Sequence, residues 1–434
     1  MQKVFRKPLA ILLSLVMVFT ALSAGFVIPA VAADVWSGSY SDSSGFVIDG
    51  TTVTISSANG FAYFANQVNN GTTYSGYAVN LTTDIDLANL SFVGIGTHQT
   101  AFRGIFDGKN HSVSGVNISI TNDYNVGLFR EVLSGKISNL TLASGTVHGN
   151  MNVGGIVGSA QGQYTVSGCV NHADVICNSD TCGGIVGYAI TGNTGNVNNC
   201  INYGSISADQ GGCGGVVGYV NGALNISDCI NYGTVTGGSG TTYYAGGIVG
   251  YVQAYTQNIT NSVNFGDVSS SGAGAAGILG AVKADTEANI IKCFNYGDIT
   301  ATKEAAGIFG YTTGSVWHYV TSCANFGTIR GIKWSGGISG NCAYTVVNSC
   351  FNKGNVSALD GGRTASFGGI NGTDGNVKYS YNRGDVTYGY YAGGIFGNDA
   401  GYKLYCYNTG NITGATVNKQ IVGDDTGSTD ICFY

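Results

Sequence analysis

A repeating unit of about thirty residues runs through most of this 434-residue chain and limits what it can fold into. The unit begins as in GGIVGYA at Gly183 and ends as in NCINYGSI at Asn199. Copies of its first half start at Gly154, Gly183, Gly214, Gly246, Ala276, Ala306, Gly336, Gly368 and Gly393. Such a period is typical of solenoids, in which each thin unit buries its apolar face on the units above and below.

The second half of the unit contains a column of asparagines. Its members are Asn171, Asn202, Asn231, Asn264, Asn295, Asn325, Asn352, Asn382 and Asn408. Stacked Asn amides can form hydrogen bonds between coils about 4.8 Å apart, and Asn also tolerates the left-handed backbone of a corner. Glycines such as Gly204 follow the asparagines, where a corner needs positive φ or close backbone approach.

Short apolar, mostly β-branched runs such as Ile185-Val186 lie between these Gly and Asn positions, and they predict strands bounded by turns. Glutamate, a strong helix former, occurs only at Glu131, Glu287 and Glu304. The sequence therefore predicts an all-β parallel β-solenoid of about ten coils from Val126 onward, and a stack of that size is roughly 50 Å long.

The first half of the unit resembles the GLUG motif of bacterial surface proteins. The motif is seen as Gly184-Ile185-Val186-Gly187, Gly247-Ile248-Val249-Gly250, Gly307-Ile308-Phe309-Gly310 and Gly394-Ile395-Phe396-Gly397. Proteins with this motif include adhesin-like proteins and the non-catalytic parts of IgA-specific metallopeptidases. Ser339, Asn371 and Arg130 depart from it. The resemblance implies a right-handed solenoid at the cell surface, as does the handedness of parallel crossovers, and it implies no activity.

Three regions are expected along the chain. Residues 1–32 are predicted to be a secretory signal, with Lys3, Arg6 and Lys7 before an apolar run and a small-residue cleavage site, although an uncleaved anchor stays open. Residues 34–125 form an N-terminal capping region with a helix over Ser57–Val68 and the first strands. Residues 126–434 form the repeats. The mature protein is therefore expected to be secreted or on the extracellular surface, with no further membrane span.

Composition restricts the partners. The chain has 18 Lys and Arg against 24 Asp and Glu, a formal net charge of −6, which disfavours nucleic acid. No CxxC spacing occurs and there are only 5 His, so no metal site is expected. We also expect no cofactor and no catalytic residues. The sequence does not indicate an oligomeric state.

Most of the 12 cysteines belong to a second column, two residues before the asparagines. Ser262 and Ser380 occupy the same position in two copies, which indicates a small buried residue instead of a bonded pair or a ligand. Outside this column, Cys182 and Cys213 stand before equivalent Gly-Gly pairs in adjacent coils. A disulfide between them, or between Cys177 and Cys182, stays open.

An aromatic column is the candidate binding site. It consists of Tyr203, Tyr232, Phe265, Tyr296 and Phe326, each directly after an asparagine of the first column. Stacked rings stabilise a solenoid face, and the same rings, if exposed, form a platform for sugar rings. Asp267 and Asp298 share another column in adjacent coils, with Asp385 about three coils further on, as acidic groups that a polysaccharide-degrading enzyme would need.

These features favour a non-catalytic binding or adhesion module for a glycan or a host protein. Two alternatives remain. A polysaccharide-degrading β-helix enzyme would need three or more carboxylates clustered with a basic residue in one groove. A structural stalk of a larger surface protein would have a featureless surface. The fold alone does not decide among them.

Overall fold

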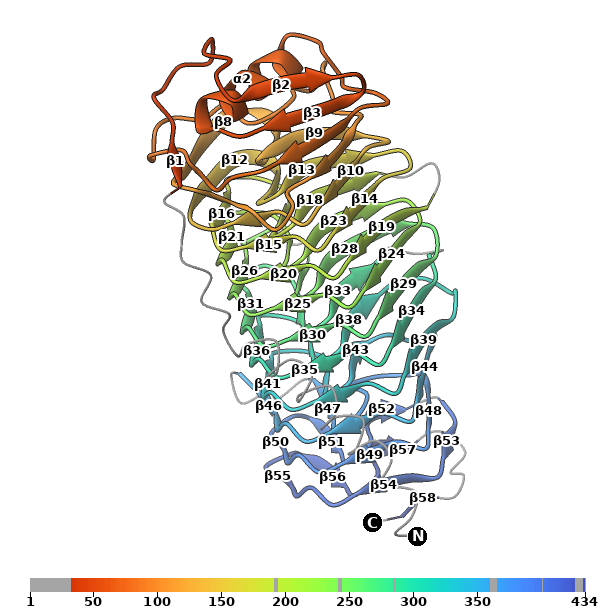
Figure 1. The fold of residues 1–434 in the computed structure, drawn as a ribbon. Coiled ribbons are helices and arrows are strands. Elements are labelled where there is room, and N and C mark those ends of the chain that lie inside the picture. The colour runs from red at the N-terminus through yellow and green to blue at the C-terminus, as the bar shows by residue number, and fades with distance from the viewer. Residues whose placement is uncertain are drawn as a thin grey trace. The chain divides into compact units, whose positions relative to one another are not determined.

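The computed structural model describes residues 33–190, 194–240, 244–283, 286–359, 365–399, 401–425 and 432–433, so the expected signal peptide lies outside them. The unit that begins at Asp34 is an all-β, right-handed parallel β-solenoid (Figure 1). Its strands pair with their counterparts one coil away, as the repeat predicted. One hydrophobic core extends through these coils, from Trp36 near the start to Val422 near the end.

One coil of the array shows the plan. Its strands are β19 (Gly195–Asn198), β20 (Ile201–Asn202), β21 (Ile206–Ala208), β22 (Cys213–Gly214) and β23 (Val217–Asn221). Equivalent residues face each other across coils, so Val197 pairs with Ile226 and Asn202 with Asn231. Alternate residues are buried along these strands, and their β-branched side chains fill the core.

Two long sheets form in the described residues. The first, which we call the asparagine sheet, contains β1 (Asp34–Val35), β5 (Ile85–Asp86), β7 (Ser112–Ser114), β11 (Thr141–Leu142), β15 (Val170–Asn171), β20, β25 (Ile230–Asn231), β30 (Val263–Asn264), β35 (Phe294–Asn295), β40 (Ala324–Asn325), β45 (Phe351–Asn352), β49 (Tyr381–Asn382), β54 (Cys406–Asn408) and β58 (Cys432–Phe433). The second contains β2 (Phe46–Asp49), β3 (Thr52–Ile55), β4 (Ala78–Leu81), β6 (Ile105–Asp107), β10 (Lys136–Ser138), β14 (Thr165–Ser167), β19, β24 (Leu224–Ser227), β29 (Gln257–Thr260), β34 (Ala288–Ile291), β39 (His318–Thr321), β44 (Thr345–Asn348), β48 (Asn376–Lys378) and β53 (Lys403–Leu404).

Shorter strands complete the coils. A third sheet contains β8 (Val116–Val126), β12 (Gly145–Gly154), β16 (Asp174–Cys177), β17 (Cys182–Gly183), β21, β22, β26 (Val235–Gly237), β27 (Ala245–Gly246), β31 (Val268–Ser270), β32 (Ala275–Ala276), β36 (Ile299–Ala301), β37 (Ala305–Ala306), β41 (Ile329–Gly331), β42 (Ser335–Gly336), β46 (Val356–Ala358), β47 (Ser366–Gly368), β50 (Val386–Thr387), β51 (Tyr391–Gly393), β55 (Ile412–Thr413) and β56 (Val417–Lys419). The eight-stranded sheet contains β9 (Phe129–Leu133), β13 (Val157–Gln161), β18 (Val186–Ile190), β23, β28 (Val249–Ala254), β33 (Leu279–Val282), β38 (Phe309–Thr312) and β43 (Ser339–Asn341), and β52 (Phe396–Asp399) pairs with β57 (Val422–Asp425).

The stack extends beyond the ten coils expected from Val126 onward, into the N-terminal region. Within the described residues, each long sheet has 14 strands. The extra strands come from the N-terminal region, because β4 and β6 continue the second sheet that the repeats form. The long strand β8 then runs from this region into the array and pairs with β12.

The predicted helix caps the start of the stack. It runs from Ala58 to Asn69 as α2, one residue later than expected, and Ser57 is its N-cap, accepting a hydrogen bond from the Gly60 amide at 2.9 Å. Phe61 and Phe64 are fully buried and contact aromatic rings of the first coils. Together with the antiparallel hairpin of β2 and β3, the helix lies at the red end of the ribbon in Figure 1.

The asparagine column forms a continuous hydrogen-bonded ladder. Each side-chain amide donates to the amide oxygen of the next coil at 2.7–2.9 Å, from Asn171 through to Asn408. It also donates to the carbonyl oxygen two residues ahead, which for Asn231 is that of Gly233 at 2.8 Å. Both bonds are fully buried, so the ladder satisfies polar groups that water cannot reach.

The left-handed backbone lies elsewhere than expected. It is adopted by the residue directly before each Cys or Ser of the second column, not by the ladder asparagines. Those residues are Gly168, Asn199, Asp228, Asn261, Lys292, Ser322, Ser349, Tyr379 and Tyr405. The glycine two residues after every ladder asparagine except Asn171 has a different cause, because a Cβ on Gly233 would lie 1.9 Å from the carbonyl oxygen of Gly204. Close coil contact therefore selects those glycines.

The cysteine column is buried and its thiols are free, as the exchange with serine predicted. The Cys229 thiol lies 3.3 Å from the carbonyl oxygen of Ser227, and the Ser262 hydroxyl makes the same bond to Thr260 at 2.9 Å. Of the two disulfides left open, the Cys182 and Cys213 sulfurs lie 2.7 Å apart as free thiols. Cys177 instead donates to the Asn150 carbonyl at 3.1 Å.

We predict that Asn231→Leu destabilises the array. The change removes two amide–amide bonds and the bond to Gly233, and each buried group left without a partner costs about 1–3 kcal/mol. The denaturant midpoint of the chain measures the effect. Asn258→Leu is the control, since Asn258 is exposed in the next coil and water replaces its bonds to Asn225 and Asn289. Equal midpoints for the two variants would contradict a stabilising ladder.

We predict that Cys229→Ser folds and keeps a stability within about 1 kcal/mol of the native chain, because serine already makes the equivalent bond at Ser262. Cys229→Leu, which adds volume to a closed position, is expected to cost about 1–3 kcal/mol. Urea unfolding of both variants checks this. A serine variant that fails to fold would show that the thiol itself is required.

Candidate functional site

The aromatic column predicted from the sequence is a regular stack of rings on the outer side of the asparagine sheet. His172 begins it, and the rings of Tyr203, Tyr232, Phe265, Tyr296 and Phe326 follow. Neighbouring centroids lie 4.5–4.9 Å apart and the ring planes differ by 3–12°. The spacing matches that of the coils, so the structure brings all five candidate residues together.

The stacking determines which part of each ring a partner can reach. A ring between two others has both faces covered, and its edge and any hydroxyl point outward. Tyr203 is 44%, Tyr232 42% and Phe265 41% exposed. Partial burial raises the pKa of the Tyr232 and Tyr296 phenols, so both stay neutral and can donate hydrogen bonds. The column is therefore a strip of aromatic edges and phenol groups instead of a platform of open ring faces.

A second set of rings extends this strip, and the sequence analysis missed it. Phe351, Tyr381 and Tyr407 stand directly before the ladder asparagines, on the other flank of the same column. Their centroids lie 5.3–5.4 Å apart, and Phe351 meets Phe326 edge to face at 6.0 Å. The signal was present in the sequence, because the position before Asn changes from aliphatic to aromatic in the later copies.

The carboxylates of the acidic column accept hydrogen bonds from the backbone of the neighbouring coil. A carboxylate oxygen of Asp267 accepts a hydrogen bond from the Asp298 amide at 2.8 Å, and Asp298 accepts one from Thr328 at 2.7 Å. Asp385 accepts from the Asn411 amide in the same way, at 2.8 Å. Since each carboxylate accepts a hydrogen bond from a backbone amide of the adjacent coil, the column stabilises the contact between coils.

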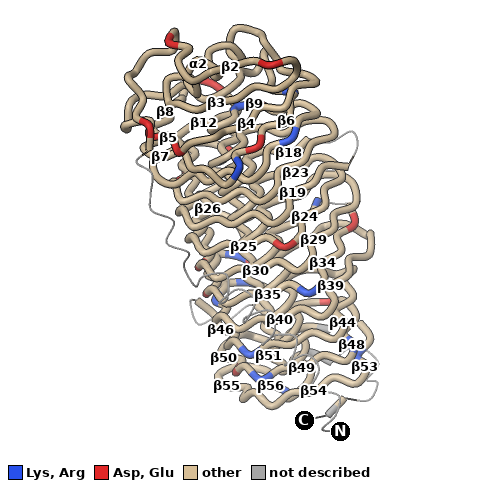
Figure 2. Tube along the Cα trace, in the orientation of Figure 1, with Lys and Arg blue, Asp and Glu red and all other residues tan. Residues whose placement is uncertain are grey.

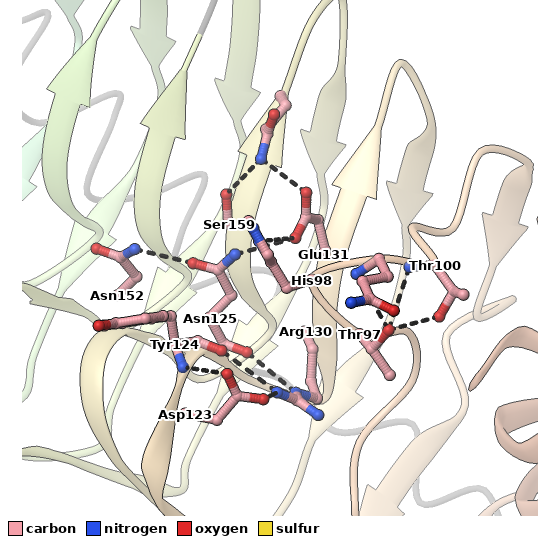
Figure 3. Close-up of polar contacts among 12 residues, drawn as sticks. Thr97, His98, Thr100, Asp123, Tyr124, Asn125, Arg130, Glu131, Asn152 and Ser159 are labelled. Carbon is pink, nitrogen blue, oxygen red and sulfur yellow. Dashed lines mark hydrogen bonds and ion pairs between the residues drawn. The ribbon is translucent and has the colours of Figure 1, made fainter. Parts of the chain in front are cut away.

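A denser polar network lies where the N-terminal region meets the array (Figure 3). Arg130, which replaces a motif glycine, is 7% exposed and forms an ion pair with Asp123. Its guanidinium also donates to the carbonyl oxygens of Asn125 at 3.2 Å and Tyr124 at 3.3 Å. The side chain thus holds the end of β8 against β9.

Glu131 is the second carboxylate of this network. It accepts hydrogen bonds from Asn125 at 3.0 Å and Gln161 at 2.7 Å, and His98 lies 3.5 Å away. Burial raises the pKa of the Glu131 carboxyl, and Asn125, His98 and Arg130 oppose that shift. The enzyme alternative calls for at least three clustered carboxylates, whereas this network supplies Asp123 and Glu131, both held by protein groups.

Charge is sparse along the array. The sequence has no Lys or Arg between Ile137 and Val282, and Figure 2 shows long uncharged stretches of the coils. Among the residues that the structure describes, no three His, Cys, Asp or Glu side chains are grouped so that they could hold a metal ion. Over the same described ranges, no helix is long and apolar enough to cross a membrane.

Comparisons with known proteins give little further guidance. No protein-family model matches the chain. No curated protein matches it either. A crystal structure described as a "putative immunoglobulin A1 protease" from Bacteroides ovatus is similar at 18% sequence identity and a TM-score of 0.38, over 72% of this chain and 78% of that chain. The strand pairing within the chain itself shows the fold.

We predict that Asp123→Asn lowers the melting temperature at pH 7 by more than it does at pH 3. Burial raises the pKa of Asp123, but the hydrogen bond and charge of Arg130 outweigh this and leave it lowered. A lowered folded pKa adds stability above the unfolded value of about 3.9, and this is lost as pH falls through the folded pKa.

Thermal melts of the native chain and the variant at both pH values test this. Asp209→Asn, an exposed aspartate of the array, is the control and is expected to change neither melt. If Asp123→Asn lowers the melting temperature by the same amount at pH 7 and pH 3, the charge of Asp123 contributes nothing to stability.

Proposed function

We propose that this protein is a secreted or cell-surface binding module without catalytic activity, and that the strip of aromatic edges binds a glycan or a host protein. One observation carries the proposal. Aromatic side chains that are exposed or partly exposed stack across successive coils, from Tyr203 to Phe326. Exposed aromatic groups in a contiguous arrangement are typical of interaction surfaces.

The mode of contact follows from the covered ring faces. Phenol groups of Tyr203, Tyr232 and Tyr296 project from a rigid sheet and can donate to and accept from hydroxyl or amide groups of a partner. The ring edges add apolar contact area between these phenol groups. An extended partner can then make many weak contacts that sum along the strip, and a rigid sheet loses little entropy on binding.

Export of the chain is part of the proposal. Its support is the sequence pattern of residues 1–32, with basic residues, an apolar run and small residues at the cleavage site. The resemblance of the repeats to the GLUG motif supports a surface location in the same way. A net charge of −6 favours neutral or basic partners over nucleic acid.

A three-site variant tests the strip without disturbing the stack. Tyr203→Phe, Tyr232→Phe and Tyr296→Phe together keep every ring, and the same column already accepts Phe265 and Phe326. We expect this variant to fold like the native chain and to lose about ten-fold or more in affinity, because three hydrogen bonds of about 0.5–1.5 kcal/mol are removed.

The native chain is first screened on a glycan array and against a panel of extracellular host proteins, and the variant is compared on each ligand found. Tyr319→Phe is the matched control, since Tyr319 is 42% exposed on the second sheet, as Tyr232 is on the asparagine sheet. Absence of any ligand in both screens, or equal binding by the three-site variant, would refute the proposal.

A further inference from the structure

A pocket of about 370 Å³ lies on another part of the surface, between the third sheet and the eight-stranded sheet. Two tyrosines, two lysines, Trp334, Asn341 and Glu304 line it. Three of these residues stand directly before the short strands β27, β37 and β42 of different coils, and the others flank them or come from β38 and β43. The size lies at the lower end of the range for small-ligand sites, about 300–1,000 Å³.

The pocket exists because two coils depart from the repeat. Tyr188, Tyr219 and Tyr251 form a column on the eight-stranded sheet, where Ala281 takes the next place before Tyr311. The ring of Tyr244 fills this gap and stacks on Tyr311, with centroids 4.9 Å apart and planes 8° apart.

Gly274 lets Tyr244 cross the intervening coil. The register places Ala245, Ala275 and Ala305 in line, so Gly274 precedes the middle of the three. A Cβ on Gly274 would lie 2.5 Å from the Tyr244 ring. The Tyr244 hydroxyl then reaches Glu304, two coils away, and donates to its carboxylate at 3.4 Å. The tyrosine pair therefore makes a fixed aromatic wall.

Glu304 is the buried acidic residue of this site. It is 3% exposed, and burial raises the pKa of its carboxyl, while the Lys303 and Lys333 ammonium groups oppose the shift. Its hydrogen bond from Tyr244 is long, at 3.4 Å, and a carboxylate has about four acceptor positions. A buried carboxyl group lowers the stability of the fold. Where a protein retains one at the edge of a pocket, its oxygens can accept hydrogen bonds from a ligand.

The charge of the pocket selects the kind of ligand. Two lysines against one glutamate leave an excess of one positive charge, in a chain whose formal net charge is −6. Lys333 places its ammonium 5.8 Å from the Trp334 ring centre, so its charge lies beside an aromatic face. A ligand with a single negative charge matches this excess. The several phosphate charges of a nucleotide would exceed it, and the Glu304 carboxylate would repel them.

We propose that this pocket binds a monoanionic sugar residue of an acidic glycan. The lysines pair with the anionic group, Trp334 packs against the apolar face of the sugar ring, and Glu304 and Asn341 accept hydrogen bonds from its hydroxyls. The anionic group is a carboxylate or a sulfate ester. The site is independent of the aromatic strip, which lies on the asparagine sheet, so either proposal can fail alone.

Matched pairs of probes test the inference on the mature native chain. We would use methyl glycosides of glucuronic acid, of N-acetylneuraminic acid and of galactose 6-sulfate. Their neutral counterparts are the methyl esters of the two acids and the unsulfated galactoside. Calorimetry and tryptophan fluorescence measure affinity. We expect about ten-fold or more preference for one anionic probe over its neutral counterpart, which weakens as salt screens the charges.

Variants then place the binding in this pocket. Lys333→Gln removes one exposed cation and is expected to reduce the preference for the anionic probe about ten-fold, while Lys353→Gln, an exposed lysine on the asparagine sheet, changes nothing. Trp334→Leu is expected to weaken anionic and neutral probes alike. The three-site tyrosine variant of the strip should bind these probes as the native chain does.

Preference for the carboxylates or for the sulfate identifies the anionic group, and either supports the proposal. Three results would overturn it. The first is equal binding of anionic and neutral probes, and the second is no binding of any probe at about 10 mM. The third is a loss of probe binding in the three-site tyrosine variant and no loss in Lys333→Gln. That result would place the binding site on the aromatic strip and would agree with the proposed function.

Discussion

Hydrogen bonding between coils about 4.8 Å apart is the constraint on which the rest of this molecule depends. Backbone strands provide part of it, and the buried asparagine ladder adds a side-chain bond and a backbone bond in every coil from Asn171 to Asn382. The ladder works only in exact register, since a slip of one residue would turn each amide outward and leave its partners unpaired in the core. It therefore selects one alignment for all the coils that it joins.

Most of the other columns follow from that spacing. Glycine two residues after all but the first ladder asparagine allows the coils to approach, because a Cβ at Gly233 would meet the backbone of the coil before it. Cysteine or serine fits the second column because both are small and donate to a nearby carbonyl oxygen. Asp267 and Asp298 bind amides of the next coil, and the aromatic rings stack at the coil spacing. The same side chain recurs because the same geometry recurs in every coil. Recurrence by itself therefore indicates a structural role and is no evidence of a binding or catalytic one.

Departures from the repeat are where the surface gains individual features. Arg130, in place of a motif glycine, anchors the end of β8, the strand that leads from the N-terminal region into the array. Gly274 and Ala281 leave space for Tyr244 to cross a coil and reach Glu304. The aromatic strip is different, because it follows the repeat and its rings stabilise each other. Its binding role depends on the edges and hydroxyls that stacking leaves exposed.

The sequence by itself determined the solenoid, its parallel register, the burial of the cysteine column, the capping helix and the alignment of Tyr203 with Phe326. These follow from local periodicity, since residues one repeat apart must become neighbours when coils stack. The tertiary structure decided which residues carry the left-handed backbone, that ring faces cover each other, and that Asp267 serves its neighbouring coil. It also decided the pocket, because Tyr244 and Glu304 are two coils apart and meet only where Gly274 leaves room. Such a contact depends on the side chains missing from the coil between them, and a pattern of equivalent positions does not show it.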